Sequence, residues 1–371
     1  MFSALYLAFP ILSLAAFLWL PARTAVGLVY LVGLVWLPPA DYAPSQPTQF
    51  PYWIVGSLVP SDLLLAKAWL APLTALLGSL IFASGTWRTF RFERIDLPVA
   101  GLCLWPLVQT LLVRGADPAG WQSSLYLIGV WGIPWLLGRC FFREASDIWL
   151  LLKLLVGVML SLLPIALWEG AFGPDLYGVL LQSHPFVADG SSRYIGWRPI
   201  AAYENGNQYG IWICAAAFAG WALVRKYAGD PASEKWIIIA CIVTLLAVAA
   251  QSVGALILLI GALILYFIGS MRRLLLRASL PLLAVTMLFG GIYASGVLPI
   301  RAWAEHSAIG RTSLDMVRST GRGSFAWRVS QDQRVVPLIA KAPIVGAGHW
   351  NWWRPANTRP WGAAMLILGQ F

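Results

Sequence analysis

Residues 2–20 have the sequence FSALYLAFPILSLAAFLWL, in which no side chain is charged. Apolar blocks of similar size, roughly 16 to 22 residues, recur along the chain, and about 20 such residues are enough for a helix to cross a hydrocarbon core of about 30 Å. Helices can enter lipid because they satisfy their own backbone hydrogen bonds. The sequence therefore predicts an all-α fold, a polytopic transmembrane helical bundle.

The overall composition supports this prediction. Of the 371 residues, 59% are hydrophobic and only 11% are charged, whereas a soluble globular chain carries roughly 25% charged residues. Length alone would suggest two or three soluble domains, but the composition favours a single membrane domain over residues 1–371. The block at 2–20 lacks the basic start and the cleavage site of a signal peptide, so we expect it to be kept as the first span.

The apolar blocks define the expected membrane spans. These are residues 2–20, 24–39, 62–83, 97–113, 122–138, 148–168, 208–225, 236–251, 255–270 and 279–298. A further block begins at Trp361 and stops at Phe371, which is too short to cross a bilayer. We therefore expect about 11 to 12 spans in a longer protein, of which this sequence is a C-terminally truncated part.

The short basic loops predict the orientation of the bundle. Excess lysine and arginine in short loops marks the cytoplasmic side, and the basic loops here are 87–94, 139–144, 224–226 and 271–277. The segments expected on the opposite side, together with the N-terminus, are 40–61, 114–121, 169–207 and 299–360. Two of these are long extracytoplasmic loops, which we name the earlier loop (169–207) and the late loop (299–360), and the functional site is expected there.

The late loop is strongly basic and contains Arg328. A basic loop beside a bilayer suits lipid headgroups or an anionic substrate. Ser324 can cap a helix that Pro343 ends, and Asp332 lies four residues after Arg328, so the two side chains can form an ordinary ion pair on the helix surface. The alternative is that Arg328 binds phosphate with its planar guanidinium.

The earlier loop ends in SSRYIGWRPIAAYENGNQYG, residues 191–210. Arg193 and Arg198 are either anchors at the membrane interface or ligands, and Asn205 or Asn207 is either a helix cap or part of a site. The two arginines lie on the same predicted side as Arg328. Three arginines that converge there would suit a pyrophosphate better than a neutral sugar.

Two residues are candidates for a catalytic base. His349 follows a glycine turn, and its unperturbed pKa lies near neutrality, although a lone histidine in a loop is more often a solvated bystander. Glu204 could accept the proton of an acceptor hydroxyl if partial burial raises its pKa. His184 and His306 are weaker candidates.

The sequence gives no sign of a metal site or a cofactor. The cysteines Cys103, Cys140, Cys214 and Cys241 are scattered, without the spacing of a metal site or a disulfide framework. Neither long loop contains a DxD-like pair of carboxylates. The expected partners are membrane lipids and an anionic lipid-linked substrate, and no nucleic acid is expected.

The late loop resembles a motif of the O-antigen ligase and O-antigen polymerase superfamily. That motif has an arginine, a tryptophan four residues on, and then about eleven residues to P-x-x-G-x-G. Here Arg328, Pro343, Gly346 and Gly348 occur at that spacing, with Asp332 at the tryptophan position. The segments SRYIGWRP…ENGNQYG and QSVGALILL (251–259) are also similar, so the resemblance covers roughly residues 190–371 by motif.

The resemblance implies a GT-C-like membrane glycosyltransferase or polymerase in the bacterial inner (cytoplasmic) membrane. Members take a glycan from a polyprenyl pyrophosphate carrier, without a metal, and pass it to a glycan or lipid acceptor of cell-surface polysaccharide. Arg328, with Arg193 or Arg198, would bind the pyrophosphate. Trp361 stands where ligases carry a catalytic histidine, so either His349 replaces it, or the chemistry differs, or the protein is inactive.

Two other function classes remain open. A transporter or flippase of lipid-linked polysaccharide would need charge within the membrane, and often shows repeated halves with broken helices; we see no internal repeat, and charge gathers in the loops. The missing histidine is compatible with a third class, a non-catalytic partner of an exopolysaccharide complex. For the enzyme, the aromatic side chains of HWNWW, which include Trp350, Trp352 and Trp353, could stack on sugar rings.

Overall fold

The computed structural model describes residues 2–38, 66–113, 120–173, 195–203, 206–268, 306–319, 334–348 and 352–353, with a few isolated positions between 277 and 369. Within these ranges the regular structure is helical and contains no strand. The all-helical fold predicted from the apolar blocks is therefore confirmed. The predicted span 279–298 is described only at isolated positions, and nearly all of the apolar block 361–371 lies outside the described residues.

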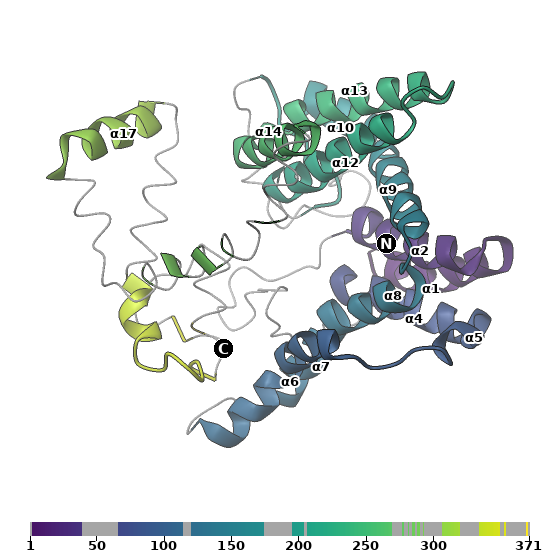
Figure 1. The fold of residues 1–371 in the computed structure, drawn as a ribbon, viewed down its shortest axis with the longest axis horizontal. Helices are drawn as coiled ribbons and strands as arrows, with labels where there is room; N and C mark the ends of the chain where they lie inside the picture. Colours follow the sequence, from purple (N-terminus) through teal and green to yellow (C-terminus); the bar gives the residue numbers. More distant parts are fainter. Residues whose placement is uncertain are drawn as a thin grey trace. The chain divides into compact units, whose positions relative to one another are not determined.

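The helices follow the predicted spans closely (Figure 1). In chain order they are α1 (Phe2–Trp19), α2 (Ala22–Trp36), α4 (Lys67–Phe82), α5 (Ser84–Trp87), η1 (Arg94–Asp96), α6 (Leu97–Leu112), α7 (Gly120–Leu127), η2 (Ile128–Gly132), α8 (Ile133–Phe141), α9 (Ala145–Leu160), α10 (Leu163–Phe172), α12 (Gly206–Lys226), α13 (Ser233–Ala249), α14 (Val253–Phe267) and α17 (Ala308–Ser319). The expected spans 208–225 and 236–251, for example, correspond to α12 and α13.

Three helical stretches among the described residues are long and apolar enough to cross a membrane. They are Arg94–Leu112, Gly120–Phe141 and Ala145–Phe172, and they contain most or all of the expected spans 97–113, 122–138 and 148–168. The helices α1, α2, α4 and α14 are apolar but shorter.

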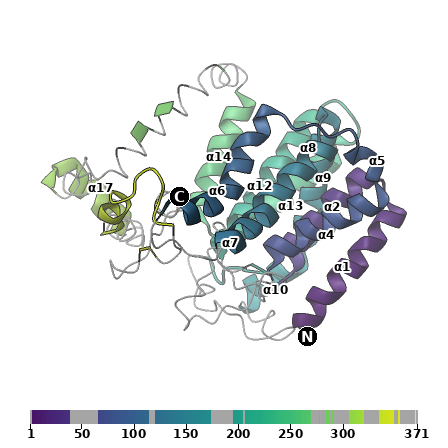
Figure 2. The same ribbon diagram turned by 90° about the horizontal axis from the view of Figure 1, so that it is seen from below.

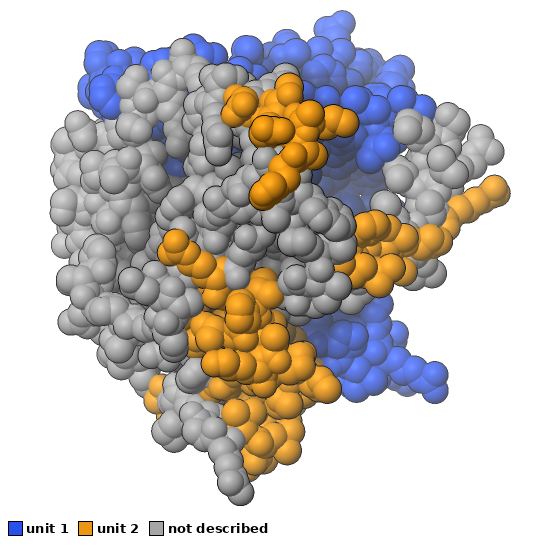
Figure 3. All heavy atoms as spheres, turned by 90° about the vertical axis from the view of Figure 1, so that its left-hand side faces the viewer, with its two compact units in different colours: residues 1–53, 58–100, 126–272 blue, residues 54–57, 101–125, 273–371 orange. Residues whose placement is uncertain are grey.

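The chain divides into two compact units, which Figure 3 shows in different colours. Unit 1 contains Met1–Trp53, Leu58–Ala100 and Tyr126–Arg272. Unit 2 contains Ile54–Ser57, Gly101–Leu125 and Arg273–Phe371. Most of the described helices belong to unit 1.

Helix α12 is central to the core of unit 1. It packs against α9, α13 and α14, and Figures 1 and 2 both show it beside α13 and α14. Its contact faces are made of small side chains, and Ala216, Ala217 and Ala219 are fully buried. A Cβ atom on Gly220 would lie 3.2 Å from the Cα atom of Ala240 in α13. Small residues allow this approach, as they do between helices in membranes.

Helices α2 and α4 form a second close contact, beside α1 (Figure 2). A Cβ atom on Gly33 of α2 would lie 2.5 Å from the Cβ of Ala71 in α4 and 2.7 Å from the Cζ of Phe9 in α1. Glycine at this position therefore sets the spacing of three helices.

One end of unit 1, which we name the basic end, contains residues 88–96, 139–149 and 225–236. Arg139 forms an ion pair with Glu93 at 3.0 Å, and Arg23 of α2 forms one with Asp147 at 2.6 Å. The Lys226 ammonium lies 4.5 Å from the centre of the Trp149 ring. Three of the basic loops that were predicted to share a side of the membrane thus share one end of unit 1.

Replacement of Gly33 by alanine should destabilise unit 1. The added methyl group meets Ala71, whose Cβ cannot rotate away, and overpacking of this kind costs about 1–3 kcal/mol. The matched control is Gly157→Ala in α9, where an added Cβ meets no atom within 4 Å. Thermal unfolding of the purified protein in detergent should show a lower apparent Tm for Gly33→Ala than for Gly157→Ala. Equal values would show that the α2–α4 contact is looser than described.

Candidate functional site

The candidate site lies at the end of unit 1 where α12 and α14 begin and α13 ends. Arg198 is only 1% exposed. Its Nε donates a hydrogen bond to the carbonyl oxygen of Ala250, just after α13, at 3.0 Å, and its Nη2 donates one to Asn207 Oδ1, in the first turn of α12, at 2.7 Å. A cation is favourable at the C-terminal end of α13, where the helix dipole is negative. Arg198 therefore joins its own loop to two helices.

Asn207 receives a second hydrogen bond from α14. The hydroxyl of Ser252 donates to Asn207 Oδ1 at 3.4 Å, and Asn207 is exposed whereas Ser252 is buried. The two helices come close because residue 210 is glycine, since a Cβ there would overlap the side chain of Ser252. The carbonyl of the Asn207 side chain is thus fixed from two directions, which fixes the plane of its amide group.

Glu169, near the end of α10, holds the earlier loop from the other side. Its Oε2 accepts hydrogen bonds from the backbone N–H groups of Ile200 at 2.8 Å and Ala201 at 2.7 Å. The side chain is 1% exposed, and Ala201 has a φ of 51°, which is uncommon for a residue other than glycine. A buried carboxylate is favourable only when donors of this kind compensate its charge.

Lys67, at the start of α4, is the third charged side chain on this loop. Its Nζ donates a hydrogen bond to the carbonyl oxygen of Ala202 at 2.7 Å and lies 4.6 Å from the centre of the Tyr203 ring. Burial raises the pKa of the Tyr203 hydroxyl well above its usual value, and this hydroxyl donates to Met159 Sδ at 3.4 Å. Segment 195–203 is therefore held by one anion and two cations.

We name Lys67, Glu169, Arg198, Asn207 and Ser252 the polar cluster. An apolar groove of about 230 Å³ lies between α12 and α14, the helices that carry Asn207 and Ser252 near their first turns. Its lining is formed by Ile211, Cys214, Ala215, Phe218, Ala255, Leu258, Leu259 and Ala262. Polar groups at the helix starts are thus followed, along the same two helices, by an apolar groove.

Of the five residues predicted to act in catalysis or to bind the pyrophosphate, only Arg198 falls in the described part of the chain. Arg198 lies in the polar cluster, with its guanidinium bonded to protein groups. The others, Arg193, Glu204, Arg328 and His349, lie outside the described residues, as do Asp332, Trp361 and His184. His306 is exposed just before α17.

The structure adds two charged residues that sequence reasoning did not select. Lys67 falls inside the expected span 62–83, and it is 8% exposed and bonded inside unit 1, because the Ala202 carbonyl and the Tyr203 ring offer it partners. Glu169 was not selected at all. The sequence feature that could have identified Glu169 is its position as an acidic residue at the end of an otherwise apolar block. Ionisable residues are rare in such blocks and are often functional.

The P-x-x-G-x-G motif of the late loop lies in unit 2, where it follows a helical turn at 334–339. Gly346 and Gly348 have φ values of 72° and 67°, a region that favours glycine, so the predicted tight turn is present. The side-chain amide of Gln109 in α6 donates to the Val345 carbonyl. Trp352, suggested as a surface for sugar rings, is instead 3% exposed and packed in a small core with Val335, Val336 and Ile339.

Within the described ranges, no group of three or more potential metal-ligating side chains occurs. Comparison of the chain with models of protein families, with curated proteins and with solved structures found no match.

Two substitutions of Glu169 separate the effect of its charge on stability from the effect of its hydrogen bonds. Glu169→Leu leaves the N–H groups of Ile200 and Ala201 buried without an acceptor, which should cost on the order of 2 to 4 kcal/mol. Glu169→Gln keeps a carbonyl oxygen for these donors and should cost less. Apparent Tm values of the two variants check the order. If Glu169→Gln is as unstable as Glu169→Leu, the negative charge, rather than the acceptor oxygen, holds the loop.

Proposed function

We propose that the protein is a polytopic membrane glycosyltransferase or polymerase of the bacterial inner membrane. It transfers a glycan from a polyprenyl pyrophosphate carrier to a glycan or lipid acceptor in the synthesis of cell-surface polysaccharide. The observation that carries the proposal is the buried polar cluster at the end of apolar helices, with an apolar groove along the same helices. Buried charge among such helices is costly and is usually associated with function.

The polar cluster has the electrostatics of an anion site. Arg198 and Lys67 carry positive charge, and both α12 and α14 begin there, so two helix N-termini present their partial positive charge to the same region. Asn207, which is exposed and fixed by Arg198 and Ser252, is the group we assign to contact the ligand. Arg198 then acts by positioning Asn207 and by its charge.

The apolar groove supports a lipid-linked rather than a free anion. A polyprenyl pyrophosphate has an anionic head and a long hydrocarbon tail, and the polar cluster and the groove match these two parts in order along α12 and α14. Three helices long and apolar enough to cross a membrane support the membrane location. The sequence resemblance implies a further phosphate contact from Arg328, with Arg193 or Arg198 as its partner.

The proposed reaction needs no metal. The hydroxyl oxygen of the acceptor attacks the anomeric carbon, the bond from this carbon to the phosphate oxygen breaks, and the electron pair leaves with the pyrophosphate. Glu204 or His349 accepts the hydroxyl proton. Fixed positive groups stabilise the negative charge that develops on the leaving group, an effect that is large where water is excluded.

A transporter or flippase of lipid-linked polysaccharide is the second candidate. The specific observation in its favour is that Lys67, Glu169 and Arg198 are buried within a helical unit, where transporters often keep their charged residues. A non-catalytic partner in a polysaccharide complex is the third. A transporter moves the lipid-linked glycan across the membrane without consuming it. A non-catalytic partner neither moves nor consumes it.

The decisive experiment measures the release of free polyprenyl pyrophosphate by the protein in lipid nanodiscs, with a polyprenyl-pyrophosphate glycan and an acceptor. Asn207→Ala and Arg328→Ala should each lower the rate by about 100-fold or more, as expected for the loss of one preorganised donor. Lys235→Gln, an exposed residue at the basic end, is the control and should retain the wild-type rate.

The outcomes separate the three functions. Release that requires Asn207 and Arg328 supports the transferase and the proposed site. Release that neither substitution lowers keeps the enzyme and contradicts the site. If no release occurs, the protein is placed in sealed vesicles: movement of the intact lipid-linked glycan across the bilayer supports the transporter, and neither release nor movement supports the non-catalytic partner.

A further inference from the structure

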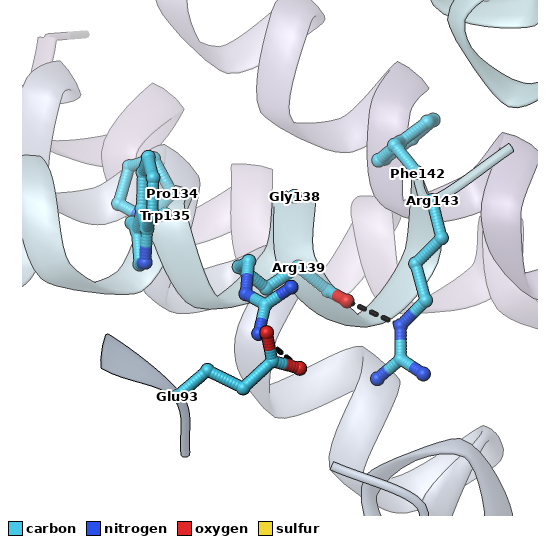
Figure 4. Close-up of a pocket in the computed structure, with 7 residues that line it drawn as sticks. All are labelled: Glu93, Pro134, Trp135, Gly138, Arg139, Phe142 and Arg143. Carbon is cyan, nitrogen blue, oxygen red and sulfur yellow. Dashed lines mark hydrogen bonds and ion pairs between the residues drawn. The ribbon is translucent and has the colours of Figure 1, made fainter. Parts of the chain in front are cut away.

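A second cavity lies at the basic end of unit 1, where the proposed transfer reaction does not use it. Its volume is about 470 Å³, and it lies between the segment before α6 and the C-terminal part of α8 (Figure 4). Trp135 and Phe142 line it with aromatic rings, Glu93 and Arg143 line it with charged groups, and Gly138 lines it with backbone. A Cβ atom on Gly138 would meet no atom within 4 Å, so the cavity is open above this residue.

Two arginines face the cavity, but only one has its charge compensated. Arg139 bonds to Asp96 Oδ1 at 3.1 Å and to Glu93 Oε1 at 3.0 Å, and Trp135 Nε1 donates to the same Asp96 oxygen at 2.7 Å. Arg143 makes no ion pair within the described part of the chain. Its Nε donates to the carbonyl oxygen of Arg139 at 2.6 Å (Figure 4), which fixes the base of the guanidinium and leaves its terminal amino groups for a ligand.

The chain segment beside the cavity alternates cationic and apolar side chains. Arg88, Arg91 and Arg94 are exposed and form no ion pair among the described residues. Between and beside them, Phe92 and Ile95 are 58% and 57% exposed. Arginines interleaved with exposed apolar side chains suit the interface of a bilayer, where apolar groups enter the acyl region and cations meet lipid phosphates.

We infer that this cavity binds the phosphate diester of an anionic phospholipid headgroup, with the Arg143 guanidinium as its principal ligand. The planar guanidinium offers two parallel N–H donors to a phosphate. Arg88, Arg91 and Arg94 supply a positive field around the cavity, while Phe92 and Ile95 contact the acyl chains of the same lipid. The exposed apolar residues point to a lipid of the bilayer, rather than free phosphate, as the source of the anion.

The inference is tested by thermal unfolding of the protein in a neutral detergent. Phosphatidylglycerol is added in mixed micelles, phosphatidylcholine serves as the zwitterionic lipid, and inorganic phosphate serves as the free anion. For the wild type, phosphatidylglycerol should give a saturable rise in apparent Tm that the other two additions do not give. Each variant is compared with its own Tm without added lipid, so a difference in basal stability does not affect the result.

Two variants disrupt the cavity by different means, and each has a matched control. Arg143→Gln removes the free cation, and Lys235→Gln removes another exposed cation at the basic end. Gly138→Leu fills the cavity without a change of charge, and Gly157→Leu places the same side chain at a glycine of α9 that also has open space around it. Arg143→Gln and Gly138→Leu should lose most of the phosphatidylglycerol-dependent rise, and both controls should retain it.

Three results would overturn the inference. Equal losses for Arg143→Gln and Lys235→Gln would show attraction to the whole basic end, not a site. An equal rise with inorganic phosphate would show a site for free anions, and an equal rise with phosphatidylcholine would show a general effect of lipid. If Gly138→Leu fails to fold, the comparison of Arg143→Gln with Lys235→Gln decides.

Discussion

The hydrogen bonds of the Arg198 guanidinium are the interaction on which the end of unit 1 that contains the polar cluster depends. They join the earlier loop to the carbonyl oxygen of Ala250, just after α13, and to Asn207 in the first turn of α12. Through Asn207 they also reach Ser252, the residue just before α14. A guanidinium suits this position because its donors diverge in a fixed plane and because it stays charged when buried. A lysine would supply one point of charge and could not span the same acceptors in one plane.

Such a buried charge is tolerated because each charged group of the cluster has acceptors or donors from the backbone. Glu169 takes two N–H groups, and Arg198 and Lys67 each donate to a carbonyl oxygen. Removal of one partner from a buried charged pair is usually far more costly than the pair is stabilising. The cluster therefore fixes the conformation of segment 195–203 more than it adds to the free energy of unfolding. A binding site requires a loop with such a fixed conformation.

The helices could be predicted from the sequence because they coincide with long apolar blocks, and the length and polarity of a block are local properties. The tight turn at Gly346 and Gly348 is local in the same way. The partners of Arg198 could not be predicted, since Ala250 is 52 residues away and a single sequence contains no signal for that distance. The partner of Lys67 could not be predicted for the same reason, because its acceptor at Ala202 is 135 residues away.

The ion pair between Arg23 and Asp147 has a consequence for the order in which unit 1 is assembled during synthesis. The two residues are 124 positions apart, and a ribosome adds about 5–20 residues per second, so the hairpin of α1 and α2 exists for on the order of ten seconds before its partner is made. During that time Arg23, whose side chain is 53% exposed, has no Asp147 to pair with. The contact between α2 and α9 therefore forms only after α4 to α8 have been made, so this part of unit 1 is completed late in synthesis.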